Sequence, residues 1–445
     1  MALPLQLPWY DTAHPALDRL SPEATRALQR QRLQAMVAYV YHSSPFYRRK
    51  FESAGIRPED IRSLEDLHFL PFTTKAELQA DQEANPPFGS YACSHPSTWT
   101  RAFATSGTTG RPLKRLLSHR DWELCAQLVR RRSYWASSGD TAPSIVVSLH
   151  PTDGLFGPTL GMEADRRPGT VRVGLGRYRS EQKVRLIHEL RPTVVTGTVS
   201  YLLYLGRLAA EMGLPFHQVS SLRALTTGFE PGASEEHTQR RLKLLWGEQV
   251  AVIETYGMTE LFGFGGGCPD CSRLHIPCDG VLTEVIDPQS GEPVAPGELG
   301  ELVFTNLICD TQPLIRYRSG DLARVDPAPP CACASVVLLA SIEGRVDDMI
   351  VYRGVNVYPS AIERVVHSFP ELADEFQIAL QGTHERPELV VRVEPTLPGG
   401  PIPVEQLAVA LQAALGVRVR VEPCPAGSLP RSDYKARRVV DERST

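Results

Sequence analysis

The sequence predicts an α/β protein with a large N-terminal domain and a smaller α+β C-terminal domain. Its 445 residues exceed what one hydrophobic core usually supports, so two or three domains are expected. From about residue 141 onward, short apolar runs typical of strands alternate with segments of helical spacing. This alternation favours parallel or mixed sheets that are packed with helices.

Two helices are predicted near the N-terminus. Ser21-Pro22-Glu23 combines an N-cap residue, a first-turn proline and an acid that suits the helix dipole. Apolar residues follow at helical spacing, namely Leu33, Met36, Val37 and Val40. Ser44-Pro45 starts a second helix, and Gly55 suits its end.

The middle of the chain predicts strands joined by helices. One helix is capped by Ser180 and stops at Pro192, and another lies between the last two strands. The predicted strands are 144–149, 170–175, 193–197, 222–228 and 250–257.

A proline-rich loop at 326–334 precedes the smaller C-terminal unit. That unit contains an alternating strand at 417–421 and a helix whose one face carries Val404, Leu407, Ala408, Leu411 and Leu415. We place the domain boundary near Asp347, which gives domains 1–346 and 347–445.

Composition limits the partners that the chain can have. With 47 basic and 51 acidic residues, neither nucleic acid nor an anionic membrane is expected as a partner. The N-terminal segment lacks a signal pattern, and no apolar run approaches the roughly 20 residues of a bilayer span. We expect a soluble, cytoplasmic protein with reduced cysteines. The oligomeric state is left open, with a homodimer as one alternative.

The most informative segment is ATSGTTGRPLK at 104–114. Glycines allow backbone N–H groups to turn toward an anion, while hydroxyls and a lysine add donors that suit phosphate oxygens. The order of residues is not that of a Walker loop. Taken alone, such a segment is more often an ordinary surface turn.

Four further motifs follow in order: TYGMTE at 255–260, YRSGDLA at 317–323, GRVDDMIVYRGVNVYP at 344–359 and LPRSDYKARR at 429–438. Together with the loop, they resemble the adenylate-forming superfamily of acyl-CoA synthetases, adenylation domains and luciferases. The segments at 43–56 and 353–363 are more similar to the phenylacetate-CoA ligase family.

The resemblance implies a two-step reaction. An aromatic or arylacetic carboxylate attacks the α-phosphate of ATP, giving an acyl-adenylate and pyrophosphate, and coenzyme A then accepts the acyl group. ATP, Mg²⁺ and coenzyme A are the implied cofactors. The resemblance also implies a mobile C-terminal domain that rotates about a hinge at Asp347.

The resemblance assigns phosphate and metal contacts to the first two motifs. Thr259 would meet the α-phosphate, and Glu260 would hold Mg²⁺, a hard cation that prefers oxygen ligands. Without the flanking residues of the TYGMTE motif, Glu260 would be interpreted as a solvated acidic residue of a loop. The implied phosphate loop consists of Ser106, Gly107, Thr108, Thr109, Gly110 and Lys114.

Other motifs would bind the nucleoside and complete catalysis. Asp321 would accept hydrogen bonds from the ribose, although it also suits a turn after glycine, and Arg345 would add a second ribose or phosphate contact. Lys435 would bridge the α-phosphate and the attacking carboxylate, although such a lysine is ordinarily just solvated. The implied adenine pocket consists of Gly228, Phe229, Glu230, Pro231 and Tyr256; Phe229 replaces the small residue that is usual in the family.

Two close pairs of cysteines favour a structural zinc site, because thiolates at short spacing can converge on Zn²⁺. Cys268 and Cys271 form one pair, and Cys331 and Cys333 form a tighter one. His275 is an alternative ligand. The competing interpretation is a set of buried thiols that bind no metal.

The pocket for the acid substrate is the part of the site that the sequence indicates least clearly. Family segments place its walls at Tyr134, Trp135, Phe156, Gly157, Gly161, Thr198 and Tyr201. Two alternatives to an aryl-CoA ligase stay open. One is an amide-forming ligase or carrier-protein loader that uses the same adenylate, and the other is a non-catalytic nucleotide-binding regulator.

Overall fold

The structure is a computed structural model. It describes residue 7 and residues 14–105, 111–136, 144–152, 154–164, 169–262, 264–268, 271–326, 331, 337–383, 387–430 and 438–443. The chain divides into two compact units. Unit 1 comprises Met1–Tyr178, Pro192–Thr196 and Ile253–Ala340, and unit 2 comprises Arg179–Arg191, Gly197–Val252 and Ser341–Thr445. The expected domain boundary at Asp347 stays a prediction.

Unit 1 begins with helices whose caps were predicted. Ser21 caps α1 (Pro22–Ser43) and accepts a hydrogen bond from the N–H of Ala24, while Ser44 caps α2 (Pro45–Ser53). Gly55 follows α2 with a φ of +70°, a conformation that glycine adopts without strain. Short 3-10 helices lie at Pro15–Arg19, Pro58–Asp60, Glu65–Phe69 and Pro96–Thr98, and α3 spans Lys75–Ala84.

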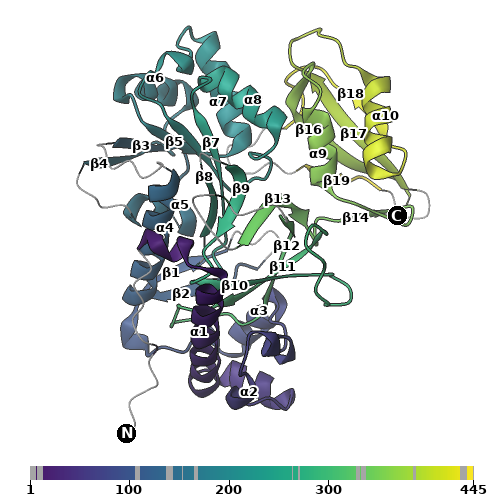
Figure 1. The fold of residues 1–445 in the computed structure, drawn as a ribbon. Helices are drawn as coiled ribbons and strands as arrows, with labels where there is room; N and C mark the ends of the chain where they lie inside the picture. The colour runs from purple at the N-terminus through teal and green to yellow at the C-terminus, as the bar shows by residue number, and fades with distance from the viewer. Residues whose placement is uncertain are drawn as a thin grey trace. The chain divides into compact units, whose positions relative to one another are not determined.

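The strands of unit 1 form an antiparallel hairpin and two longer runs (Figure 1). The hairpin pairs β1 (Trp99–Ala104) with β2 (Lys114–Ser118). One run is parallel, in the order β5 (Val194–Gly197), β3 (Ser144–Ser148) and β4 (Thr170–Gly174). The other has the order β10-β11-β12-β13-β9-β8-β7, and its described pairings are antiparallel.

The strands of the antiparallel run span Ala251–Gly257 (β7), Phe264–Cys268 (β8), Cys271–Ile276 (β9), Val281–Ile286 (β10), Gly300–Asn306 (β11), Tyr317–Val325 (β12) and Val337–Arg345 (β13). Two helices of unit 1, α4 (His119–Ala136) and α5 (Phe156–Ala164), pack against each other. The short strand β6 (Ala224–Thr227) belongs to unit 2. The predicted α/β class is therefore confirmed.

Unit 2 contains three helices, of which the second packs against both the first and the third (Figure 1). They are α6 (Ser180–Leu190), α7 (Val199–Glu211) and α8 (Glu236–Trp246), with a 3-10 turn at Phe216–Gln218. The prediction that Ser180 caps α6 was wrong, because Arg179 is the N-cap and its N–H donates to the side chain of Gln182. Gly206 lets α7 approach α8 closely, because a Cβ there would lie 2.8 Å from Cβ of Leu245. The indole of Trp246 donates a hydrogen bond to the carbonyl of Leu202 over 3.0 Å.

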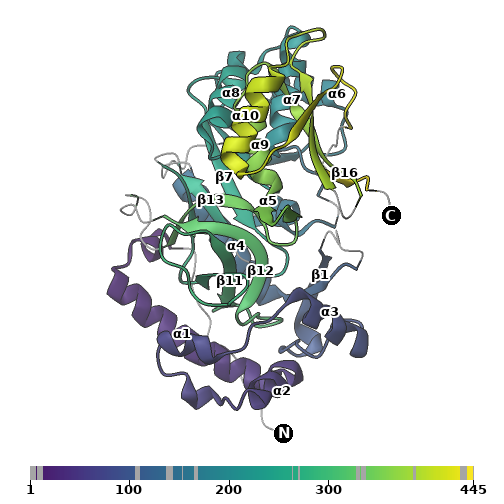
Figure 2. The ribbon, with the colours of Figure 1, turned by 90° about the vertical axis from the view of Figure 1, so that its right-hand side faces the viewer.

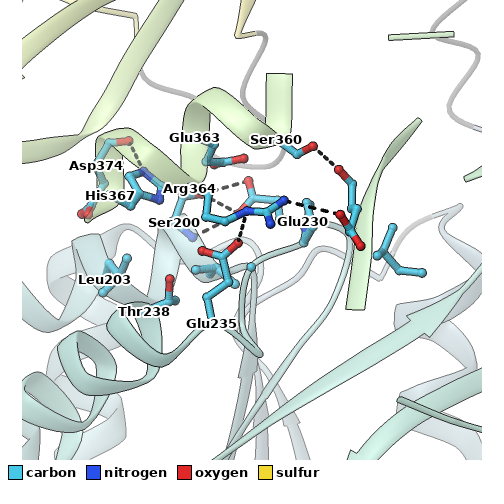
Figure 3. Close-up of a pocket in the computed structure, with 15 residues that line it drawn as sticks. Ser200, Leu203, Glu230, Glu235, Thr238, Ser360, Glu363, Arg364, His367 and Asp374 are labelled. Carbon is cyan, nitrogen blue, oxygen red and sulfur yellow. Dashed lines mark hydrogen bonds and ion pairs between the residues drawn. The ribbon is translucent and has the colours of Figure 1, made fainter. Parts of the chain in front are cut away.

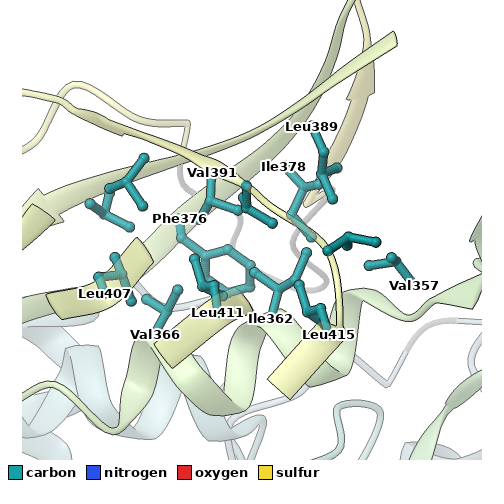
Figure 4. Close-up of a cluster of buried hydrophobic side chains, with 14 of the residues drawn as sticks. Val357, Ile362, Val366, Phe376, Ile378, Leu389, Val391, Leu407, Leu411 and Leu415 are labelled. Atoms are coloured by element: carbon teal, nitrogen blue, oxygen red, sulfur yellow. The ribbon is translucent and has the colours of Figure 1, made fainter. Parts of the chain in front are cut away.

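The C-terminal part of unit 2 has its own sheet and core. The four-stranded sheet has the order β18-β17-β16-β19, and β14 pairs separately with β15. The strands span Ile350–Tyr352 (β14), Val355–Val357 (β15), Leu372–Gly382 (β16), Pro387–Pro395 (β17), Arg420–Pro423 (β18) and Val439–Asp441 (β19). Helices α9 (Pro359–His367) and α10 (Val404–Leu415) pack together with this sheet, and Phe376, Leu407 and Leu411 lie in the shared core (Figure 4).

Asp121 of α4 fixes the segment that leads into β12. Its carboxylate accepts hydrogen bonds from the backbone N–H groups of Asp310 and Thr311, over 2.8 and 3.0 Å. The side chain is fully buried. Since β11 and β12 lie side by side (Figure 2), Asp121 helps to set the place where β12 begins.

We predict that Asp121→Ala lowers the free energy of unfolding by about 1–3 kcal/mol, because it leaves two backbone donors without their acceptor. Chemical denaturation measures the change. Glu123→Ala, which removes a half-buried acid from the same helix, is the matched control. Equal stability of the two variants would show that the Asp121 contacts contribute nothing specific.

Candidate functional site

The predicted phosphate loop connects the two strands of a hairpin in unit 1. Ala104 of β1 is paired with Lys114 of β2, and the connection is closed by Thr105 and Leu113. The N–H of Thr105 donates to the carbonyl of Leu113, and the N–H of Leu113 donates to Oγ1 of Thr105, both over 3.0 Å. Lys114 is exposed. Ser106, Gly107, Thr108, Thr109 and Gly110 lie outside the described residues.

The hairpin is held against α3 by a buried amide. Gln82 donates to the carbonyl of Lys114 over 2.6 Å, and its Oε1 accepts from the N–H of Lys114 over 3.2 Å. These two hydrogen bonds fix the backbone at the start of β2. They therefore fix the Cα atom from which the exposed side chain of Lys114 extends.

A short hydrogen bond joins two predicted nucleoside residues. The hydroxyl of Tyr256, near the end of β7, donates to Oδ2 of Asp321 on β12 over 2.7 Å. Asp321 is 8% exposed, whereas Tyr256 is half-buried and its ring centroid lies 6.1 Å from that of Phe304. A carboxylate that accepts one phenol can still accept further hydroxyl donors, such as those of a ribose.

Asp321 is positioned by a bulge in β12. Glu301 of β11 is paired with Leu322 and Val303 with Arg318, so three residues of β12 face the single residue between these two pairs. Gly320 lies in this bulge with a φ of +77°, and its N–H donates to Glu301 over 3.1 Å. Within the bulge, Ser319 accepts the N–H of Asp321 over 3.0 Å.

Glu260 is paired with a lysine that the sequence analysis did not identify. Its carboxylate lies 3.3 Å from Nζ of Lys75 and accepts a long hydrogen bond of 3.5 Å from the hydroxyl of Tyr317. Thr73 exchanges backbone hydrogen bonds with Arg316 and Arg318, which brings the start of α3 beside β12.

A sequence signal for Lys75 was available. It is the first residue of α3, directly after the N-cap Thr74, where the helix dipole disfavours a cation. A lysine at such a position indicates a partner elsewhere in the fold, and here that partner is Glu260. Thr259, the neighbour of Glu260, is half-buried in the turn after β7.

Unit 2 contains the predicted adenine segment from Gly228 to Pro231. Gly228 is buried, whereas Phe229 is 45% exposed and has a φ of +70°. The carboxylate of Glu230 accepts from the N–H of Ser200 over 3.0 Å and from its hydroxyl over 2.8 and 2.9 Å (Figure 3). Burial raises the pKa of Glu230, while the hydrogen bonds from Ser200 act in the opposite direction.

A pocket of about 560 Å³, open solvent included, lies beside Glu230 in unit 2 (Figure 3). Five carboxylates line it together with Arg364 and His367: Glu230, Glu235, Glu343, Glu363 and Asp374. Burial lowers the pKa of His367, which favours its neutral form. This excess of acids suits neither a triphosphate nor a carboxylate substrate.

The predicted walls of the acid pocket fall in both units. Phe156 is buried in unit 1 among the rings of Phe103, Trp122 and Phe262. Gly157 and Gly161 lie on α5, and a Cβ at Gly161 would meet no atom within 4 Å. Tyr134 and Trp135 belong to α4, but their side chains lie outside the described residues.

The other two predicted wall residues lie at the start of α7 in unit 2. Thr198 is the N-cap and accepts the N–H of Tyr201. The hydroxyl of Tyr201 accepts a hydrogen bond from Nζ of the buried Lys183 over 3.0 Å and lies 3.0 Å from the hydroxyl of Ser180. A contact between these wall residues and the acid substrate stays a prediction.

Arg345, the last residue of β13, contacts Asp347 in the turn that follows. Nε of Arg345 donates to Oδ1 of Asp347 over 2.8 Å, and Asp347 is exposed. The solvent exposure of Asp347 is compatible with a change of its backbone angles. The role of Asp347 as the hinge stays a prediction. Lys435 lies outside the described residues.

Backbone pairing brings Cys268 of β8 opposite Cys271 of β9. Their side chains lie outside the described residues, as does Cys333, whereas His275 is buried and Cys331 half-buried. Arg273 forms a 3.5 Å ion pair with Asp326, near the segment that carries Cys331. Within the described part of the chain, no group of three or more His, Cys, Asp or Glu residues is arranged to hold a metal.

A search of the described helices for a membrane span finds none with sufficient length and apolar character.

Two family models match the chain. One, described as AMP-binding enzyme, matches residues 26–306, and the other, described as AMP-binding enzyme C-terminal domain, matches residues 354–443. Phenylacetate-coenzyme A ligases of Thermus thermophilus and Escherichia coli are 34% and 32% identical to the chain. Both alignments cover 96% of this chain, and they cover 99% and 97% of the two relatives.

Solved structures agree with these matches. A 2-hydroxyisobutyryl-CoA ligase in its postadenylation state, bound to 2-HIB-AMP, is 29% identical with a TM-score of 0.87, over 100% of this chain and 95% of that one. The same ligase with 2-HIB-AMP and CoA in its thioesterification state has a TM-score of 0.71. An amide bond synthetase of Marinactinospora thermotolerans, 19% identical with a TM-score of 0.57 over 76% of this chain and 68% of that one, shares the fold.

We predict that Gly320→Ala both destabilises the protein and weakens ATP binding. A side chain at this positive φ costs roughly 1–2 kcal/mol, and relief of the strain would move Asp321. Gly399→Ala, at a φ of +73° with open space around its Cβ, supplies similar strain far along the chain. Calorimetric titration with ATP should show weaker binding for the first variant alone. Unchanged ATP affinity in Gly320→Ala would contradict the positioning role of the bulge.

Proposed function

We propose that this chain, which belongs to the phenylacetate-CoA ligase family of AMP-forming acid–thiol ligases, activates an aromatic or arylacetic acid and transfers it to coenzyme A. The single observation that carries the proposal is the Tyr256–Asp321 hydrogen bond, because it joins two motifs that were assigned separately to nucleoside binding. Identities of 34% and 32% to phenylacetate-coenzyme A ligases, over nearly the whole chain, support the class of acid.

Asp321 and Tyr256 are proposed to hold the nucleoside. The buried carboxylate of Asp321 would accept hydrogen bonds from the ribose hydroxyls, and the half-exposed ring of Tyr256 would offer an apolar face to the adenine. The tyrosine hydroxyl keeps the carboxylate oriented before the nucleotide arrives. Such preorganisation reduces the entropy cost of binding.

Glu260 and Thr259 offer oxygen atoms that fit a hard cation such as Mg²⁺. When bound, this ion would neutralise charge on the phosphates. The ion pair between Glu260 and Lys75 would have to open or widen, because an ammonium group and a divalent cation compete for the same carboxylate. Lys75 therefore keeps the carboxylate paired until the nucleotide and its metal bind.

Lys435 and the hinge at Asp347 complete the proposed reaction. The carboxylate of the acid and the α-phosphate are both negatively charged and come together when the acid attacks. Lys435 would offset this charge. The second step needs different groups over the same acid, so the C-terminal domain would turn about Asp347 between the steps. The exposure of Asp347 is compatible with such a change of backbone angles.

Coenzyme A is the acceptor that the relatives favour, since the phenylacetate ligases and the 2-hydroxyisobutyryl ligase are named for it. The amide-forming alternative has weaker support, because the amide bond synthetase shares only the fold at 19% identity. We further propose action in the cytoplasm on small molecules. A homodimer stays an alternative that the sequence left open.

We predict pyrophosphate release that depends on ATP, Mg²⁺ and an aryl or arylacetic acid. The assay screens such acids with and without coenzyme A, and thioester formation should require the thiol. Lys435→Ala should lower adenylation about 10²–10³-fold, the usual effect of deleting one preorganised charge. Thioester formation from a pre-made acyl-adenylate should persist in this variant.

Two results of the screen would contradict the proposal. A folded protein that releases no pyrophosphate with any acid would favour the nucleotide-binding regulator. Turnover with amines but not with coenzyme A would instead favour the amide-forming ligase.

A structural zinc ion remains part of the proposal. Its ligands would be Cys268, Cys271, Cys331 and Cys333, with His275 as an alternative fourth ligand. The backbone pairing of Cys268 with Cys271 supports one half of the set, and the Arg273–Asp326 ion pair ties the region of Cys331 to the same strand. Four thiolates would leave no open position, so the ion would be structural.

We predict one zinc ion per chain that survives dialysis against a chelator. Elemental analysis of the protein and of a Cys268→Ser/Cys333→Ser variant measures it, and the variant should lose the metal. Cys424→Ser, which changes a half-buried cysteine of the C-terminal part, is the matched control. Absence of zinc from the unaltered protein would remove this site.

A further inference from the structure

One buried carboxylate in unit 2 is held by two arginines from separate helices. Asp374 lies near the start of β16, and its side chain is 3% exposed. Nη2 of Arg241 on α8 lies 2.5 Å from Oδ1 of Asp374, and Arg207 on α7 donates to Oδ2. We call these three residues the clasp.

The surroundings keep Asp374 ionised. Burial alone would raise its pKa, but the guanidinium groups of Arg207 and Arg241 outweigh burial and lower the pKa below the ordinary value. A ring nitrogen of His367 lies 3.1 Å from the backbone carbonyl of Asp374, and the labelled side chains lie together in Figure 3.

The clasp joins parts of the chain that are matched by different family models. Arg207 and Arg241 fall within residues 26–306, and Asp374 falls within residues 354–443. A buried carboxylate that loses its cations becomes strongly unfavourable. The clasp can therefore form only while β16 lies against α7 and α8, and Asp374 must reach water or another cation when they separate.

A second ion pair supports the same packing. Nε of Arg364 on α9 lies 3.5 Å from Glu235, the residue before α8, and this arginine is 48% exposed. An exposed pair of this kind contributes at most about 1 kcal/mol. The buried clasp therefore contributes more than this exposed ion pair to the packing of β16 against α7 and α8.

Similarity to the solved ligase indicates which step uses this arrangement. The chain matches the postadenylation complex with a TM-score of 0.87 and the thioesterification complex with 0.71, at the same identity and coverage. We propose that Asp374 is a positioning residue, whose clasp by Arg207 and Arg241 favours the arrangement used for adenylation. This inference rests on the proposed function.

The test separates the two half-reactions in Asp374→Asn and in Arg207→Gln/Arg241→Gln. ATP–pyrophosphate exchange reports adenylation, and conversion of a pre-made phenylacetyl-adenylate by coenzyme A reports thioester formation. We expect the exchange to fall about tenfold, with thioester formation unchanged or faster. The corresponding double lysine variant should keep most of the exchange activity, because it retains both cations.

Arg240→Gln is the matched control. Arg240 is the neighbour of Arg241 on α8, is 74% exposed and pairs with Glu236 on the same helix, so both half-reactions should stay at the unaltered level. Equal loss of both half-reactions in Asp374→Asn, or no loss in either, would overturn the proposal. An effect of Arg240→Gln as large as that of the clasp variants would also overturn it.

Hydrogen exchange makes the test independent of catalysis. In Asp374→Asn, amides of α7, α8 and the first residues of β16 should exchange faster, while those of α4 in unit 1 should not change. Unchanged exchange in all of them would contradict the clasp even in a protein with no detectable activity. If the unaltered protein shows no activity but the exchange result holds, the proposed function fails and the clasp stands.

Discussion

The position of Asp321 depends on the bulge of β12, because a regular strand would carry its carboxylate to a different place. Gly320 supplies the positive φ that the bulge needs, and Ser319 and Glu301 satisfy the backbone donors that the irregularity exposes. Tyr256 of β7, a strand that is not adjacent to β12 in the strand order, then holds the carboxylate. Irregular backbone is thus used where a functional side chain must be aimed, and its polar groups are satisfied by nearby side chains.

The two units use charge in different ways. In unit 1, Glu260 is paired with Lys75, which is partly exposed and able to exchange its partner. In unit 2, Asp374 is buried and held by two arginines, so separation of these groups must carry a large electrostatic cost. The first arrangement suits a carboxylate that has to release its cation to bind a metal. The second suits a contact that must be either fully formed or fully broken.

Local sequence signals predicted much of the parallel part of the fold. The strands at 144–149 and 170–175 and the helix near Ser180 agree with β3, β4 and α6, because their periodicities are local. The predicted cap was wrong by one residue, because Arg179 is the N-cap of α6 and Ser180 is its first residue. Of the antiparallel run, the strand at 250–257 agrees with β7, and the other six strands were not predicted. All seven residues of β11 are buried, and a strand buried on both faces loses the alternation that would identify it.

The site was predictable where motifs carry it and not where distant segments meet. Tyr256 and Asp321 were assigned to the nucleoside from separate motifs, and the structure brings them into contact. Lys75 was missed because its partner lies far along the chain, although its unfavourable place at a helix start was a usable signal. The clasp left no local signal, since Arg207 and Asp374 are 167 residues apart and either could be a solvated surface charge.

The central claim is that the acid is activated as an adenylate, and oxygen transfer tests it most directly. Attack of the carboxylate on the α-phosphate, followed by attack of the thiol on the acyl carbon, leaves one carboxylate oxygen on AMP. Phenylacetate, or the best acid found, should be labelled with ¹⁸O in both oxygens and turned over with ATP and coenzyme A. Mass spectrometry of the products should find one ¹⁸O in each AMP and none in inorganic phosphate. Label in inorganic phosphate, or unlabelled AMP alongside the thioester, would contradict the account.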